Sequence, residues 1–140
     1  MLFRSTIAGN VTVGTGSGTG AYLSPGANSN TPGTLTIQKR LTFAADGTYN
    51  YGLKASNATA DKVVAKEVSI DGAALFSFTA IGGGVLTPGT IFTAIDNNAA
   101  TPIAGTFANL ADGSTFTVGS NTYLVSYEGG TGNDLTLTVQ

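Results

Sequence analysis

Residues 34–53 read TLTIQKRLTFAADGTYNYGL, and the spacing of the apolar residues in this stretch decides the fold class. These residues recur at every second position in three short runs: Leu35 and Ile37, then Leu41 and Phe43, then Tyr49, Tyr51 and Leu53. Successive side chains of a β-strand point to opposite faces, so this alternation indicates strands with one buried face. The Asp46-Gly47 pair between the second and third runs is typical of a tight turn. The stretch therefore predicts short strands joined by turns.

The same pattern continues through the rest of the 140 residues. The later alternating runs are Val68 and Ile70, Phe76 and Phe78, Phe116 and Val118, Tyr123 to Tyr127, and Leu135 to Val139. Residues 58–68 include helix-favouring Ala, Lys and Glu, but their valines favour a strand that leads into the turn at Asp71-Gly72. We count about a dozen short strands, a number typical of a sandwich, a barrel or a solenoid.

The composition excludes several classes of function. Charged residues make up only 10% of the chain, Cys and His are absent, and the six Lys and Arg residues are scattered. Without Cys and His there are no disulfides, no thiol chemistry and few options for zinc. Without a basic stripe we expect no binding of nucleic acid. No segment approaches the roughly 20 apolar residues of a membrane helix, so we expect no membrane insertion.

One short motif suggests a metal site. Residues 129–134 read GGTGND and resemble the start of a calcium-binding nonapeptide repeat, in which the eighth position is apolar. That position is Thr136 here, and the motif occurs once, whereas Ca²⁺ needs six to eight oxygen ligands. We interpret the motif as a turn before the last strand, and we predict no metal and no cofactor. Asp134 is the residue that would hold an ion if a site existed.

Candidate catalytic groups are few. Most of the acidic residues lie in predicted turns, and only Glu67 and Asp71 lie close together near one strand, four residues apart and therefore on one face. Cleavage of a glycosidic bond needs such paired carboxylates. A set of tyrosines could line a sugar groove, but their spacing along strands is more typical of core packing: Tyr49, Tyr51, Tyr123 and Tyr127. We predict no catalytic residues and no enzyme activity.

The order of several motifs points to a family. Residues 23–26 (LSPG) precede 33–36 (GTLT), and 88–97 (PGTIFTAIDN), 105–110 (GTFANL) and 127–135 (YEGGTGNDL) follow. This order resembles the autotransporter-associated β-strand repeats of bacterial surface passenger proteins, over roughly residues 20–139. The resemblance implies a parallel β-helix located outside a Gram-negative-type cell. The first residues lack the continuous apolar stretch of a signal peptide, so we expect a fragment of a longer, exported, repetitive precursor.

The expected fold is all-β, a right-handed parallel β-helix of roughly five coils that forms a single domain over residues 1–140. An antiparallel β-sandwich is the alternative fold. The open first and last coils of such a solenoid expose unpaired strand edges, which invite end-to-end pairing.

We therefore expect a non-catalytic structural or adhesive segment of a bacterial cell-surface or secreted protein. The expected partners are further copies of the chain or neighbouring coils of the parent protein, and glycans are a further candidate. A carbohydrate-binding β-module and a polysaccharide-cleaving β-helix are the alternative functions.

Overall fold

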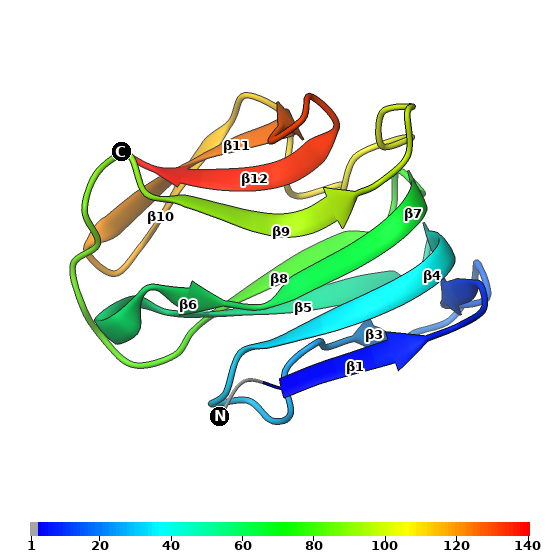
Figure 1. The fold of residues 1–140 in the computed structure, drawn as a ribbon, viewed down its shortest axis with the longest axis horizontal. Helices are drawn as coiled ribbons and strands as arrows, with labels where there is room; N and C mark the ends of the chain where they lie inside the picture. Colours follow the sequence, from blue (N-terminus) through cyan, green and yellow to red (C-terminus); the bar gives the residue numbers. More distant parts are fainter. Residues whose placement is uncertain (1–2) are drawn as a thin grey trace.

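The computed structural model describes residues 3–140, which form a β-solenoid of about three turns (Figure 1). One sheet, sheet A, contains β1 (Phe3–Ile7), β2 (Val11–Val13), β4 (Gly33–Phe43), β7 (Lys62–Ile70), β9 (Ile91–Asn97), β10 (Thr115–Val118), β11 (Asn121–Gly129) and β12 (Asp134–Val139). The other, sheet B, contains β3 (Ala21–Leu23), β5 (Gly47–Lys54), β6 (Thr59–Ala60) and β8 (Leu75–Ala80). A 3₁₀ turn, η1 (Ala55–Asn57), lies between β5 and β6.

The N-terminal two thirds of the molecule consist of parallel strands stacked on equivalent strands. In sheet A, β1, β4, β7 and β9 pair in parallel, and in sheet B β3, β5 and β8 do the same. The register places Leu35 beside Val63, and Val63 beside Ile95, so like side chains lie above one another. Each turn of the solenoid, called a rung below, thereby covers the row of apolar side chains on the next turn. A solenoid buries its core in this way. The predicted parallel stacking is confirmed here.

The C-terminal part departs from the expected repetition. Strands β9, β12, β11 and β10 pair in antiparallel fashion and extend sheet A beyond its parallel part. These strands take the place of further coils, which is why the described chain makes about three turns. Figure 1 shows them at one end of the molecule and β1 and β3 at the other. Antiparallel pairing, which the sandwich alternative required throughout, is limited among the described strands to this end and to the short β5–β6 contact.

The core lies between the two sheets and is rich in aromatic residues. Phe43, Tyr49, Tyr51 and Phe107 are all almost fully buried. The rings of Phe43 and Phe107 meet edge to face with centroids 5.1 Å apart, a favourable geometry for aromatic pairs. Phe107 comes from the loop between β9 and β10, so the core joins the solenoid to its C-terminal end.

The segment with helix-favouring residues is a strand. Val63, Val68 and Ile70 of β7 are buried and alternate with polar residues, as the predicted strand before Asp71-Gly72 required. Within residues 3–140, no helix has the length and apolar character needed to cross a membrane.

Candidate functional site

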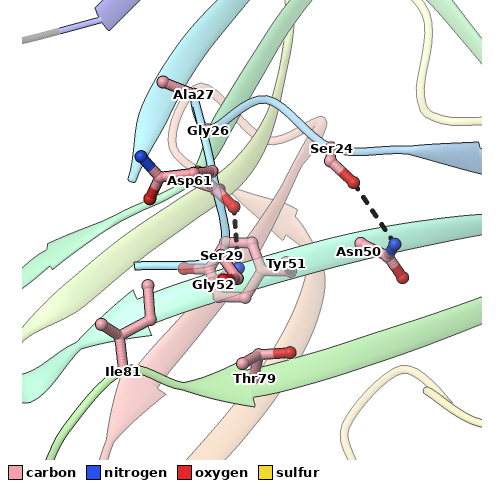
Figure 2. Close-up of a pocket in the computed structure, with 11 residues that line it drawn as sticks. Ser24, Gly26, Ala27, Ser29, Asn50, Tyr51, Gly52, Asp61, Thr79 and Ile81 are labelled. Carbon is pink, nitrogen blue, oxygen red and sulfur yellow. Dashed lines mark hydrogen bonds between the residues drawn. The ribbon is translucent and has the colours of Figure 1, made fainter. Parts of the chain in front are cut away.

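A cleft of about 410 Å³ opens on the outer face of sheet B (Figure 2). Its floor is β5, whose inward side chains fill the core while Asn50 and Gly52 face outward. Its walls come from three other segments: the loop of residues 24–29, Asp61 just before β7, and the end of β8 with Thr79 and Ile81 beyond. Gly52 lets Ile81 and Asp61 close over this floor, because a Cβ atom on Gly52 would come within 2.9 Å of Ile81 Cδ1 and 3.2 Å of Asp61 Oδ2.

The loop of residues 24–29 lies close to Asp61 because residue 26 is glycine. A Cβ atom on Gly26 would come within 2.5 Å of the Thr31 carbonyl oxygen and 3.0 Å of the Asp61 carboxylate. Any larger residue would push the loop outward and open the wall of the cleft.

Among the described residues, Asp61 is the only charged one that lines the cleft. Its two carboxylate oxygens each accept one backbone N–H, from Gly33 and from Gly52, at 2.8 Å in both cases. Burial raises the pKa of Asp61 above its ordinary value of 3.8, and the two backbone hydrogen bonds oppose that shift. Asp61 therefore joins the start of β4 to β5, and its oxygens keep further lone pairs for other donors.

The remaining polar groups of the cleft are neutral. The Asn50 side-chain amide donates to the Ser24 hydroxyl at 3.3 Å, and the hydroxyl-bearing residues Ser29 and Thr79 line the walls (Figure 2). Within residues 3–140, no lysine or arginine lines this cleft. The arrangement suits an uncharged ligand with several hydroxyl groups better than an anion.

The structure places Asp134, the residue considered as a calcium ligand, at the start of β12. Its side chain is buried, and Oδ1 accepts the backbone N–H of Asn97 at 2.9 Å. Oδ2 lies against Gly130, where a Cβ atom would come within 2.0 Å. Across residues 3–140, no three His, Cys, Asp or Glu side chains gather as metal ligands. In this structure Asp134 connects the end of β9 to β12.

The two carboxylates considered for glycosidic cleavage are engaged separately. Glu67 forms an ion pair with Arg40 on the neighbouring strand. Asp71 accepts the backbone N–H of Ala73 at 2.9 Å and stabilises its own turn. The structure therefore gives them different partners and does not join them in one site.

The parallel register gathers basic residues that are far apart in the sequence. Lys39, Arg40 and Lys66 line one shallow groove on sheet A together with Asn10 and Glu67. The ion pair with Glu67 offsets part of this charge. Sequence reasoning described these residues as scattered, because spacing along a chain does not show which positions share a rung.

The four tyrosines considered for a sugar groove lie in the core, as their spacing predicts. Tyr49, Tyr51, Tyr123 and Tyr127 are all buried, which confirms that they belong to the core. Tyr22, which sequence reasoning did not consider for a ligand, is 61% exposed on β3. It is paired with Thr48, an outward position of β5, so it lies on the same outer face of sheet B as the cleft.

No protein-family model, curated protein or solved structure matches this chain.

Proposed function

We propose that this chain is a non-catalytic structural segment of a bacterial cell-surface or secreted protein, exported within a larger precursor. In this proposal the solenoid is right-handed and belongs to a longer stack of coils. The described part of the chain supplies about three of these coils. Its N-terminal end takes up another rung, either from the parent protein or from a second copy. The observation that carries the proposal is the difference between the two ends of the solenoid.

The N-terminal end is an open rung. Strand β1 is the last strand of sheet A and pairs only with β4 in the part of the chain that the structure describes. Residues 4–7 of this strand are exposed, and Arg4 is their only charge. Natural edge strands are commonly blocked by charged side chains, especially lysine, or by proline, and Arg4 at the start of β1 is the one such residue that this strand carries. An edge of this kind can accept another strand.

The C-terminal end is closed by a C-terminal cap, residues 98–140. Where β8 would present a free edge, the Asn109 side-chain amide donates to the Phe76 carbonyl at 2.8 Å and accepts the Phe76 N–H at 2.9 Å. The same loop buries Phe107 and Leu110 over the core. The edge strand of the C-terminal cap is β10, which has four residues. Short edge strands resist pairing with a further strand.

The acidic residues also support a structural role. Each of the following carboxylates accepts a backbone N–H or pairs with a cation: Asp46, Asp61, Glu67, Asp71, Asp96, Asp112 and Asp134. Carboxylates that accept a backbone N–H or pair with a cation stabilise the loops and rungs that they connect.

The proposal is tested by size-exclusion chromatography with light scattering over a series of protein concentrations. We expect the mass of the wild type to rise with concentration towards that of a dimer. Thr6→Lys, which places a charge on the β1 edge, should keep the protein monomeric. Thr115→Lys on β10 is the matched control and should associate as the wild type does. A wild type that stays monomeric at all concentrations, or equal effects of the two variants, would contradict the proposal.

A further inference from the structure

We infer that the cleft on the outer face of sheet B binds a neutral oligosaccharide. This inference goes beyond the structural role proposed above and does not depend on how the chain assembles. It rests on two observations: the chemistry of the groups that line the cleft, and a shape that exists before any ligand arrives. An exposed tyrosine on the same outer face of sheet B offers a further contact to a longer ligand.

The polar groups of the cleft match sugar hydroxyls. A sugar hydroxyl both donates and accepts, so it needs donors and acceptors close together. Asn50 offers an amide that can do both, Thr79 a hydroxyl, and Asp61 a carboxylate with free lone pairs. An anionic ligand would meet the Asp61 carboxylate without any lysine or arginine among the lining residues to offset it. The cleft therefore favours uncharged sugars over phosphates or acidic sugars.

The apolar groups provide surfaces for the C–H face of a sugar ring. Ile81 lies at one end of the cleft. Tyr22 is 61% exposed on the same outer face, two residues before Ser24, which lines the cleft. The Tyr22 ring lies towards Gly20, where a Cβ atom would be 3.9 Å from Tyr22 Cε2. Ser24 lies roughly 6.5 Å further along the chain, so only an oligosaccharide that extends past Ser24 would contact both Tyr22 and the cleft. An exposed tyrosine offers an apolar ring to the C–H face of a sugar and a hydroxyl group to the polar atoms of the sugar.

The cleft is built in advance of binding. Gly26 permits the loop to lie against Asp61, and Asp61 holds that wall to β4 and β5 through the Gly33 and Gly52 amides. The volume of about 410 Å³ lies within the usual range of ligand pockets, roughly 300–1,000 Å³. Preformed sites lose less free energy to ordering when a ligand binds.

The experiment has two stages. The purified wild-type chain is first applied to an array of neutral oligosaccharides (gluco-, manno- and galacto-oligosaccharides) with sialylated and sulfated glycans as the anionic arm. The best neutral ligand is then titrated against the wild type by NMR. Tyr22→Ala and Thr79→Val are titrated beside two controls on sheet A, Ile91→Ala and Thr115→Val. Ile91 is 62% exposed, which matches Tyr22, and thermal unfolding confirms that each variant is folded.

We expect at least one neutral oligosaccharide to bind, with shifts at the amides of Ser24 and of residues 26–29, 50–52 and 79–81. Tyr22→Ala and Thr79→Val should each weaken binding by roughly 2- to 10-fold, the range expected for one lost hydrogen bond or stacking contact. The two control variants should bind as the wild type does. The inference is overturned if no neutral oligosaccharide binds in the millimolar range, if only anionic glycans bind, or if both cleft variants bind as the controls do. None of these results would alter the mass measurements that test the proposed assembly.

Discussion

At the scale of single residues, the two inward tyrosines of β5 differ in how their hydroxyls are bonded. Tyr49 and Tyr51 are both fully buried, and the Tyr49 hydroxyl donates to the Ala94 carbonyl at 2.8 Å. The Tyr51 hydroxyl has no hydrogen-bond partner among the described residues. A buried polar group without a partner destabilises the fold, whereas a bonded one makes a small net contribution.

Replacing each of these tyrosines by phenylalanine should therefore give opposite results. Tyr49→Phe should lower the free energy of unfolding by about 1 kcal/mol, because the hydrogen bond to Ala94 is lost. Tyr51→Phe should leave this free energy unchanged or raise it, because the unpaired hydroxyl is removed. Urea denaturation measures both values. Equal losses in the two variants would show that the Tyr51 hydroxyl is bonded in solution.

A second prediction concerns Asp46 and pH. The backbone N–H groups of Thr15 and Gly16 donate to its carboxylate and hold the pKa of Asp46 below its ordinary value of 3.8. The stability that Asp46 supplies is therefore fully present above pH 3.8 and is lost as the pH falls through the lowered pKa of the folded state. Burial raises the pKa of Asp61, so its contribution runs in the opposite sense and is lost as the pH rises.

The effect of Asp46 is isolated by comparing the wild type with Asp46→Asn. The difference in unfolding free energy between the two should shrink as the pH is lowered from about 5 to about 2, because only the wild type loses a charged acceptor. Urea denaturation at each pH gives this difference. A difference that stays constant across the range would mean that Thr15 and Gly16 do not hold the carboxylate in solution.

At the scale of elements, Tyr127 of β11 holds the loop of Phe107 and Leu110 in place within the C-terminal cap. Its hydroxyl accepts the Phe107 N–H at 3.1 Å and donates to the Leu110 carbonyl at 2.8 Å. Burial raises the pKa of Tyr127 to about 12, so the neutral hydroxyl keeps both bonds at neutral pH. The stability from this group is present below pH 10.0 and is lost as the pH rises through about 12.

Tyr127→Phe should lower the free energy of unfolding by about 1–3 kcal/mol, because two buried backbone groups lose their partner. Tyr22→Phe is the matched control, since Tyr22 is 61% exposed, and it should unfold like the wild type. Both are measured by urea denaturation at neutral pH. Similar stability of Tyr127→Phe and the control would mean that the loop of Phe107 does not depend on this hydroxyl.

The elements also show what the sequence could predict. The alternation of apolar residues predicts strands such as β4 and β5. It places Leu35 and Ile37 on the buried face of the first strand, and Tyr49 and Tyr51 on the buried face of the second. The direction of β12 does not follow, because Leu135 and its neighbours alternate in the same way whether they lie beside a parallel or an antiparallel strand. The expectation of roughly five coils required β12 and its neighbours to pair in parallel, whereas these strands pair in antiparallel fashion.

The cleft could not be predicted for a different reason. Asp61, Asn50 and Thr79 lie in separate segments, and only the pairing of β5 with β8 and the loop at Gly26 bring them together. Tyr22 lies in a stretch rich in Gly, Ser and Thr that indicates a loop, and its place beside β5 depends on the stacking of rungs.

At the scale of the whole molecule, stability comes from neighbouring rungs in contact, and the two ends differ. In a stack of this kind each rung is stabilised by the rungs on either side, so an open end is the weakest place and a closed end limits growth. The chain thus combines a parallel stack, which we propose is extended at β1, with an antiparallel C-terminal cap that ends at β10. This polarity is the central claim about the fold.

The most direct test is to measure interstrand contacts between backbone protons by NMR. Parallel and antiparallel pairs place different backbone groups opposite each other, so the two patterns are distinguishable. The backbone protons of Val63, its amide proton and its Hα taken together, should show contacts to both the Leu35 and the Ile95 strands in the parallel pattern. Antiparallel contacts in sheet A should begin only between β9 and β12. Antiparallel contacts between β4 and β7 would contradict the account.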